Sequence, residues 1–376
     1  MQHPISPWLT QRGFRTEGVC PVPSARKIGS LMGEVVMGTR RPGTPTLEEV
    51  AALAGVGRGT VSRVINNATG VKASTRRAVQ QAIEELGYVP NLAARSLAGQ
   101  RSNAVALVLT EPDWRMFAEP FFSEIVRSLG DALADIGMQL MLTLVRSDAD
   151  RKRFLEYARG SRVDGVLLLS VRAGDRLPDM LAEARLPTVM LGRRSGDEYV
   201  SYVDADNVGG ARSAVSHLVS RGRRTIATIT GPLDMDAGQC RLRGYQDALA
   251  LAGLTGEKSL VAEGDFTQDS GRRAMTELLA RHPDIDGVLA ASDTTAAGAL
   301  QALRAAGRRV PEDVAVIGFD DFPLAQRTRP RLTTVRQPLE EMGRAMIRLL
   351  LEDIEEPSVA YRHVILRTEL VVREST

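Results

Sequence analysis

Residues 46–66 read TLEEVAALAGVGRGTVSRVIN, two short amphipathic segments separated by glycines. The first segment begins with a T-x-x-E capping box, Thr46–Glu49, and continues with apolar residues at helical spacing. Gly55 is suited to end this helix in the left-handed conformation, and a second helix is predicted from about Arg58 to Asn66. Helix, glycine-containing turn and helix together form a helix-turn-helix pattern.

The second predicted helix has a polar and an apolar side. At about 100° per residue, an arc of about 140° contains Arg58, Gly59, Ser62, Arg63 and Asn66, whereas Thr60 lies on the other side with the valines and the isoleucine. Arginines and short polar side chains on one helix face are the groups that contact base edges and phosphates in a major groove. Arg58 and Arg63 would also suit a helix face that only contacts solvent, but the helix-turn-helix pattern and the basic charge of this segment favour a DNA-contacting face. The predicted DNA-contacting residues of the head are Thr46, Arg58, Gly59, Thr60, Ser62, Arg63 and Asn66.

Two of the glycines have a specific interpretation. Gly57 occupies the position of an N-cap, where glycine is tolerated. Gly59 lies on the polar side, where its missing side chain would let the backbone approach DNA closely. The G-x-G-x-G spacing does not indicate a dinucleotide-binding loop, because such a loop follows a strand and these glycines follow a helix.

Charge is unevenly distributed, although the formal net charge of the chain is only +2. Residues 40–101 contain nine Lys and Arg against four Glu, whereas residues 102–376 contain 35 basic and 40 acidic residues. A basic segment before a mildly acidic body is typical of a nucleic-acid-binding head. Cys20 and Cys240 are the only cysteines, which predicts neither a disulfide framework nor a zinc site and fits a reducing cytoplasm.

The segments around the helix-turn-helix pattern are expected to differ in kind. Residues 1–44 lack sustained periodicity and are expected to form a flexible tail, and Met32 or Met37 is a candidate for the true start. Apolar runs in the chain are strand-sized, well short of the roughly 20 residues that span a bilayer. The first forty residues also lack the apolar segment of a secretory signal. A soluble, cytoplasmic protein is therefore expected.

A third helix is predicted with Ser74 as its cap and Gly87 as its stop, which completes a head of residues 45–90. Residues 91–101 contain LAARSLAG, a piece of about two turns that is too short to be stable as an isolated helix. We expect this segment to be a linker whose folding depends on what it contacts.

From Asn103 onward, apolar strand-like runs alternate with amphipathic helical segments. Repeated alternation of this kind predicts parallel sheets with helices on both faces, and two series predict two lobes with a cleft between them. The predicted strands are 104–109, 139–145, 165–169 and 188–191 in the first series and 225–230, 259–262, 287–290 and 314–319 in the second. The predicted helices are 121–136, 151–160, 178–185, 208–221, 239–252, 269–281 and 294–306.

The segments 46–67 and 73–99 resemble the DNA-binding head and hinge of the lac-repressor (LacI/GalR) family of bacterial transcription regulators. The resemblance covers nearly all of 46–373 through shorter motifs: PFF (120–122), DN (206–207), RLRG (241–244), GDF (264–266), SD (292–293), GFDD (318–321) and LTTVRQP (332–338). It implies an α/β fold, with a two-lobed type I periplasmic-binding-protein-like core behind a small all-α head. The implied lobes are 102–205 plus about 339–366, and 206–338 plus about 367–376.

The resemblance also implies a function: a repressor that binds a near-palindromic double-stranded DNA operator as a homodimer. A small effector, expected to be a sugar or related metabolite, would bind between the lobes and compete with DNA binding by changing the order of residues 92–98. No cofactor is implied. In the hinge, Leu97 matches a residue that wedges into the minor groove. The implied hinge contacts are Asn91, Arg95 and Leu97, and the implied effector contacts are Phe121, Arg241, Phe266, Asp293 and Asp320.

Purely structural roles are the alternative for these residues. The aspartates would also suit caps of the turn after a strand, Arg241 would suit a structural ion pair, and Phe266 would suit the hydrophobic core. Ser292 and Glu119 stand where asparagine is common in the family, which leaves the effector's identity open. A solute-binding protein would suit the core alone, but the basic head and missing signal argue against it. An enzyme of sugar metabolism is disfavoured because no nucleophile with its base is apparent and the four histidines are scattered.

Overall fold

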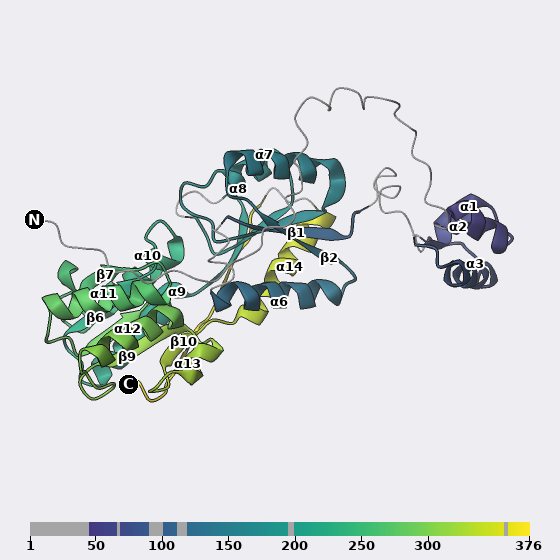
Figure 1. Ribbon diagram of the computed structural model, residues 1–376. Helices are drawn as coiled ribbons and strands as arrows, with labels where there is room; N and C mark the ends of the chain where they lie inside the picture. The colour runs from purple at the N-terminus through teal and green to yellow at the C-terminus, as the bar shows by residue number, and fades with distance from the viewer. Residues whose placement is uncertain (1–44, 66–67, 90–100, 111–118, 195–198, 357–359) are drawn as a thin grey trace, which may run out of the picture. The chain divides into compact units, whose positions relative to one another are not determined.

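The computed structural model describes residues 45–65, 68–89, 101–110, 119–194, 199–356 and 360–376 (Figure 1). The chain divides into two compact units, Met1–Pro90 and Asn91–Thr376. Several sequence predictions lie outside the described residues: the tail at 1–44, the DNA contact Asn66 and the hinge contacts Asn91, Arg95 and Leu97.

The described part of the first unit, residues 45–65 and 68–89, contains three helices, α1 (Leu47–Leu53), α2 (Arg58–Ile65) and α3 (Ala73–Leu86). The predicted capping box is confirmed, because the Thr46 hydroxyl accepts from Glu49 N at 3.2 Å and Glu49 accepts from Thr46 N at 2.7 Å. Gly55 follows α1 with φ 64°, the predicted left-handed residue. Buried side chains from all three helices, among them Val50, Val61, Val64, Val79 and Ala82, form a small shared core.

The start of α3 corrects the sequence prediction. The helix begins at Ala73 with Lys72 as its N-cap and with no side-chain cap bond, so Ser74 lies within the first turn instead of capping it. A lysine side chain has no acceptor to offer the free backbone N–H groups. The end of the helix is as predicted: Gly87 closes it with φ 61°.

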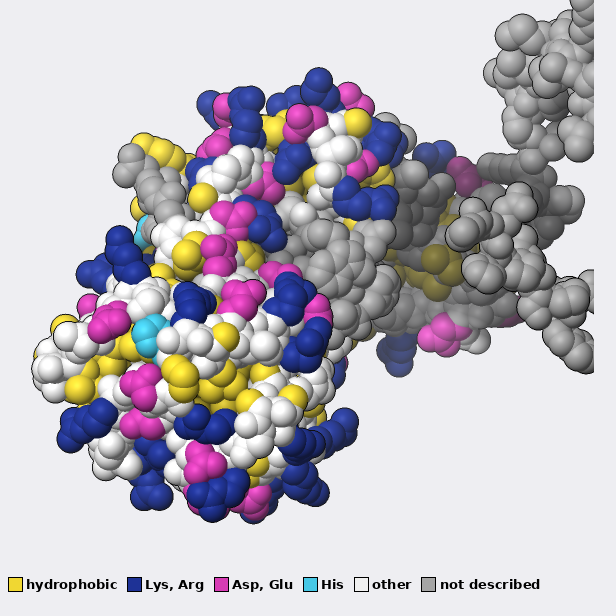
Figure 2. Space-filling view, turned by 60° about the vertical axis from the view of Figure 1, so that its left-hand side comes forward, with side chains coloured by type: hydrophobic (Ala, Val, Ile, Leu, Met, Phe, Trp, Pro, Cys, Tyr) yellow, Lys and Arg dark blue, Asp and Glu magenta, His cyan; other side chains and the backbone are white. Residues whose placement is uncertain are grey.

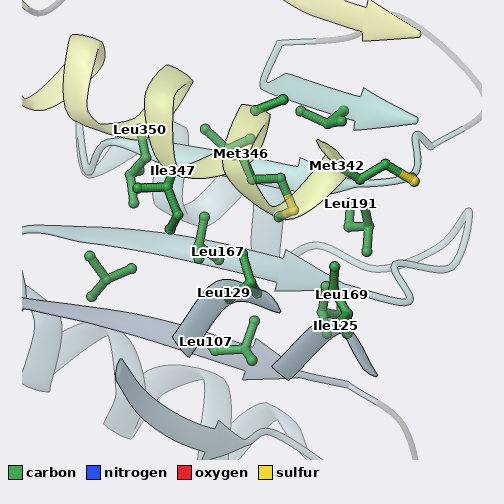
Figure 3. Close-up of a cluster of buried hydrophobic side chains, with 14 of the residues drawn as sticks. Leu107, Ile125, Leu129, Leu167, Leu169, Leu191, Met342, Met346, Ile347 and Leu350 are labelled. Carbon is green, nitrogen blue, oxygen red and sulfur yellow. The ribbon is translucent and has the colours of Figure 1, made fainter. Parts of the chain in front are cut away.

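The first sheet of the second unit is fully parallel, with the strand order β11–β5–β4–β3–β1–β2. Helices α6 and α14 pack on one face and α7 and α8 on the other. Figure 3 shows Met342, Met346, Ile347 and Leu350 of α14 against leucines of β1, β3 and β4. The bounds are β1 Ala104–Leu109, β2 Gln139–Leu144, β3 Gly165–Leu169, β4 Thr188–Leu191, β5 Ser201–Ala205, β11 His363–Leu366, α6 Pro120–Ala134, α7 Asp148–Tyr157, α8 Leu177–Glu183 and α14 Leu339–Glu355.

The second sheet has the order β12–β10–β9–β8–β6–β7, and only its β12–β10 pair is antiparallel. Helices α11 and α12 cover one face, and α9 and α10 cover the other. The bounds are β6 Ile226–Thr230, β7 Val261–Glu263, β8 Gly287–Ala290, β9 Ala315–Asp320, β10 Thr333–Arg336, β12 Glu369–Val371, α9 Asn207–Ser220, α10 Asp236–Leu251, α11 Gln268–Arg281, α12 Asp293–Ala305 and α13 Pro323–Arg327.

The chain passes between the two sheets three times, from β5 to α9, from β10 to α14 and from β11 to β12. Two lobes joined by three crossovers have the predicted fold class. Four strands had no sequence prediction: β5, β10, β11 and β12. Of these, β5 reads SYVDA and lacks a continuous apolar run, although every residue in it is buried. Helix α10 begins at Asp236, three residues before the predicted start at 239.

Figure 2 shows one face of the second unit, where Lys and Arg side chains are interspersed with Asp and Glu side chains. Mixed charge of this kind keeps a surface solvated and produces no strong field of one sign. Among the described residues, no helix is long and apolar enough to cross a membrane.

Candidate functional site

Helix α2 presents the predicted polar face to solvent. Arg58, Gly59 and Arg63 are exposed, whereas Val61 and Val64 on the opposite side are buried in the head. Ser62, Thr60 and Thr46 are partly buried. The head therefore holds α2 by its apolar side and leaves two guanidinium groups free of the core, which suits insertion into a groove of DNA.

The beginning of α2 also contacts α1. The Arg58 guanidinium lies 3.1 Å from a carboxylate oxygen of Glu48, in a pair whose side chains are 73% and 59% exposed. Gly57 precedes the helix, and its carbonyl accepts hydrogen bonds from Thr60 N and Val61 N. A side chain at Gly59 would meet no heavy atom within 4 Å in the described residues, so the head itself does not require glycine there.

The second unit contains a cavity of about 100 Å³ whose walls come from both lobes. Apolar side chains supply much of the wall, and charged and amide groups converge on it. Of the predicted effector contacts, Phe121, Arg241, Phe266 and Asp320 line the cavity. The full lining is Glu119, Phe121, Phe122, Ser170, Val171, Leu191, Gly192, Arg193, Asp204, Asn207, Met235, Asp236, Ala237, Arg241, Phe266, Ser292, Asp320, Gln337 and Met342.

Arg241 of α10 is a buried cation of the cavity, with only 7% of its surface exposed. Its Nε donates to Oδ1 of Asn207 at 2.8 Å, and its NH1 donates to the Ala291 carbonyl. NH1 also lies 3.5 Å from Oδ1 of Asp320. The guanidinium stacks over the Phe319 ring, 3.7 Å from its centroid. Burial lowers the pKa of Arg241, and the charge of Asp320 opposes that shift.

Asp320 ends β9 in an unusual backbone conformation, with φ 114°. Oδ1 of its carboxylate accepts from Nε2 of Gln337 at 2.6 Å. Burial raises the pKa of Asp320 to about 6, against the opposing charge of Arg241. A non-glycine residue at positive φ outside the usual wells is strained and is typical of functional sites. In this backbone conformation, the carboxylate of Asp320 lies beside the buried guanidinium of Arg241.

Phe266 supplies an aromatic wall. Its ring is 9% exposed and lies 5.7 Å from the Arg241 guanidinium. The ring also packs on Gly231 so closely that a Cβ there would lie 2.1 Å from Phe266 Cζ. Glycine at 231 therefore sets the position of the ring.

Asp293 departs from its predicted place, because it does not line the cavity. Its carboxylate is fully buried and accepts hydrogen bonds from Phe322 N at 2.8 Å and from the Thr334 hydroxyl. Burial raises its pKa, and the neighbouring charge of Asp320 adds to the shift. Asp293 is the first residue of α12, and its side chain is directed toward β10 and the turn after β9. It therefore stabilises the segment that carries Asp320 and does not face the cavity.

Six charged or amide residues of the cavity had no sequence prediction as effector contacts: Glu119, Arg193, Asp204, Asn207, Asp236 and Gln337. Nε of Arg193, after β4, donates to Oδ2 of Asp236 on α10 at 2.7 Å and so joins the two lobes. A second interlobe pair, Arg172 with Asp234, has an N–O distance of 2.6 Å. The DN motif at 206–207 was the sequence signal near Asp204 and Asn207.

A cavity with a planar guanidinium, carboxylates, amides and an aromatic wall suits a small molecule with several hydroxyl groups. The guanidinium donates in fixed directions, carboxylates accept from hydroxyls, and an aromatic ring covers an apolar sugar face. Among the described residues, no three His, Cys, Asp or Glu side chains are grouped to hold a metal ion.

The exposed polar helix of the head and the cavity of the two-lobed unit define a DNA-binding regulator with a ligand-binding core. Two family models match: "Bacterial regulatory proteins, lacI family" over residues 46–91 and "Periplasmic binding protein-like domain" over residues 215–376. The HTH-type transcriptional regulator CelR of Thermobifida fusca is 54% identical over 333 residues, 88% of this chain and 98% of that protein. This chain belongs to the LacI family of bacterial transcription regulators.

Other similar proteins are also transcription regulators. The ribose operon repressor of Escherichia coli K12 is 35% identical over 88% of this chain and 99% of the repressor. A solved CelR–cellobiose complex has a TM-score of 0.71 at 52% identity, with 88% of this chain and all of that chain covered. A lac repressor dimer bound to operator has a TM-score of 0.78 at 28% identity, with 89% and 99% covered. The chain is accordingly a DNA-binding transcription regulator and not an enzyme.

Proposed function

We propose that the chain is a repressor whose effector is an uncharged sugar related to cellobiose, bound in the cavity between the core lobes. The observation that carries this proposal is the arrangement of Arg241. The guanidinium is buried, fixed by Asn207, set beside the Asp320 carboxylate and covered by the Phe266 ring. A fixed donor beside an acceptor under an aromatic ring recognises adjacent sugar hydroxyls and the apolar face of the ring.

The charge of the cavity supports an uncharged effector. Four carboxylates line it, Glu119, Asp204, Asp236 and Asp320, against the guanidinium groups of Arg193 and Arg241. A phosphorylated sugar or a nucleotide would bring further negative charge into a site that already has an excess of it, which is costly where groups are shielded from water. Hydroxyl groups meet no such repulsion.

A relative supports the sugar class: a protein that is 52% identical was solved in complex with cellobiose. The cavity of about 100 Å³ is small for a disaccharide, because ligand pockets usually enclose roughly 300 Å³ or more. We infer that the lobes separate to admit the sugar, which requires the Arg193–Asp236 contact to lengthen. Sugar binding is thereby linked to the arrangement of the lobes.

For DNA binding, we propose a homodimer in which each copy places α2 in one half-site of a near-palindromic operator. Support comes from the exposed Arg58 and Arg63 and from a similar protein solved as a dimer on operator DNA. Such a regulator would act in the cytoplasm, where bacterial DNA lies. The proposed lobes of the core are residues 102–205 plus about 339–366, and 206–338 plus about 367–376, which is supported by the strands that each sheet contains.

The effector proposal is tested by isothermal titration of the purified chain with cellobiose, glucose, glucose 6-phosphate and adenine. We expect cellobiose to bind and the two other chemical classes, phosphosugar and purine, to bind at least about tenfold more weakly, because repulsion or unmatched hydrogen bonds cost about 1.4 kcal/mol or more. Tight binding of glucose 6-phosphate or adenine, with none of cellobiose, would contradict the proposal.

A variant test assigns the site. Arg241→Met is expected to abolish cellobiose binding, because it removes the forked donor while keeping a side chain of similar length. Gln239→Ala, on the exposed side of the same helix, serves as the control and should bind cellobiose like the wild type. Operator binding without sugar checks that Arg241→Met folds. If this variant keeps both operator binding and cellobiose affinity, the assigned site is wrong.

A further inference from the structure

Asp204 is the last residue but one of β5, in the first lobe, and it lines the cavity with 4% of its surface exposed. Its two carboxylate oxygens differ in their contacts. Oδ1 accepts hydrogen bonds from Ala205 N at 2.8 Å and from Nδ2 of Asn207 at 3.0 Å. Oδ2 is buried and has no hydrogen-bond partner among the described residues.

The donors nearest to Oδ2 are directed elsewhere. Nε of Arg193 lies 3.5 Å away but donates to Asp236 at 2.7 Å. The Cys240 thiol donates to the same Asp236 carboxylate at 3.1 Å, and NH2 of Arg193 is directed at that thiol. A buried carboxylate oxygen that accepts no hydrogen bond destabilises the folded state, and it does so more than an unpaired neutral acceptor. Because Oδ2 lies at the cavity, a bound ligand could supply the missing donor.

We propose that Asp204 is a specificity-determining residue of the cavity, whose Oδ2 accepts a hydrogen bond from one hydroxyl of the bound sugar. This inference rests on the proposed function, since it requires a sugar in the cavity. It adds a contact from the first lobe to the contacts of Arg241 and Asp320, which both belong to the second lobe. A sugar that donates a hydrogen bond to Asp204 and accepts one from Arg241 therefore contacts both lobes.

The contact has a consequence for selectivity. A site built to accept from a hydroxyl rejects an analogue that lacks it, because the buried oxygen is then left unpaired. The sugar hydroxyl that meets Asp204 should therefore be required, whereas hydroxyls that face solvent should be dispensable.

Ionisation of Asp204 is consistent with this role. Burial raises its pKa to about 6, Arg193 lowers it, and the neighbouring Asp236 raises it further. The other charged groups around it are Arg241 and, across the guanidinium, Asp320. A hydroxyl that donates to Oδ2 favours the ionised carboxylate.

The test is a double-mutant cycle between Asp204→Asn and removal of single sugar hydroxyls. Asparagine keeps the Oδ1 acceptor used by Ala205 and Asn207 and replaces Oδ2 by a donor, so the local fold is retained. Cellobiose and its monodeoxy analogues are titrated into wild-type protein and into the variant. We expect Asp204→Asn to weaken cellobiose binding by about 10- to 100-fold, the range for hydrogen bonds to a charged group.

One monodeoxy analogue should bind wild-type protein with a similar loss and lose little more in Asp204→Asn. Additive losses for every analogue would show that Asp204 acts only on the fold and would overturn the inference, as would unchanged cellobiose affinity. Asp164→Asn is the matched control, because Asp164 also has a buried unpaired Oδ2 but does not line the cavity. Failure of cellobiose to bind wild-type protein would instead overturn the proposed effector itself.

Discussion

Nε of Arg241 donates a 2.8 Å hydrogen bond to Oδ1 of Asn207, the first residue of α9. Asn207 follows the crossover from β5, and its Nδ2 donates to Asp204 of the first lobe. One amide thus orients the guanidinium of the cavity and ties it to a segment that joins the lobes. Movement of that crossover would shift the proposed effector contacts.

Asn207→Ala is expected to weaken cellobiose binding by about tenfold or more and to destabilise the core by about 1–3 kcal/mol, because it leaves the buried Nε of Arg241 unpaired. Calorimetric titration measures the first effect and urea denaturation the second. Gln239→Ala is again the surface control. Wild-type affinity and stability in Asn207→Ala would show that this amide does not position Arg241.

Gly231→Ala is expected to displace the Phe266 ring, because the added Cβ would lie 2.1 Å from Phe266 Cζ. Overpacking of this kind costs about 1–3 kcal/mol, and cellobiose affinity should fall by about tenfold. Gly174→Ala is the matched control, since a Cβ there meets no heavy atom within 4 Å in the described residues. Equal cellobiose affinity of Gly231→Ala and Gly174→Ala would count against Phe266 as a wall of the binding site.

Asp234→Asn removes the partly exposed interlobe pair with Arg172. Because opening must precede entry of a disaccharide, the association rate of cellobiose should rise by up to about fivefold, corresponding to an exposed ion pair of about 1 kcal/mol or less. Stopped-flow fluorescence measures this rate. Glu374→Gln, which removes an exposed pair with Arg331 within one lobe, should leave it unchanged. A slower rate in Asp234→Asn would indicate that the pair does not restrain opening.

Effector affinity is expected to increase with pH between about 5 and 7. Burial raises the pKa values of Asp204 and Asp320 to about 6. Hydroxyl donors favour the ionised carboxylates, so sugar binding lowers these pKa values and releases protons. Calorimetry in buffers of different ionisation enthalpy detects the release. Proton uptake on binding near pH 6 would contradict the proposed contacts.

The raised pKa values of Asp204 and Asp320 have the opposite effect on the stability of the core without sugar, which falls as the pH rises. A carboxyl group with a raised pKa in the folded state favours folding below its ordinary pKa, and this contribution is lost as the pH rises through about 6. Without sugar, these two groups therefore make the core less stable near pH 7 than near pH 5. Bound sugar should reduce that difference.

Gly59→Ala tests the interpretation of α2. Because a Cβ at this position meets open space in the described head, the substitution should stabilise the helix by about 1 kcal/mol. Operator affinity should nevertheless fall, since the methyl group would separate the backbone from DNA. Thermal melting and fluorescence anisotropy measure the two effects. An unchanged operator affinity and base preference would remove the reason given for glycine at this position.

The head could be predicted from sequence because its signals are local. The capping box at Thr46 and Glu49 and the left-handed Gly55 and Gly87 depend only on neighbouring residues, and the structure contains all of them. The cap assigned to Ser74 was wrong because a serine near a helix start also fits the first turn.

The cavity was predicted only in part. Arg241, Phe266 and Asp320 reach it, but Asp293 turns away because a residue at the start of a helix can point behind the strand ends instead of between the lobes. Asp204 was missed together with its strand, since SYVDA gives no apolar run to mark it. The contacts of Arg193 with Asp236 join residues far apart in the chain, and spacing along the sequence does not indicate such contacts.

Sequence-specific DNA binding that a sugar controls is the central property proposed for this protein. The decisive measurement selects duplexes from a random library with the wild-type chain and then titrates the selected duplex, by fluorescence anisotropy, with and without cellobiose. We predict a near-palindromic selected sequence, bound more tightly than random DNA and released by cellobiose. Equal binding of selected and random duplexes at every salt concentration, unchanged by cellobiose or by deletion of residues 1–101, would contradict the account.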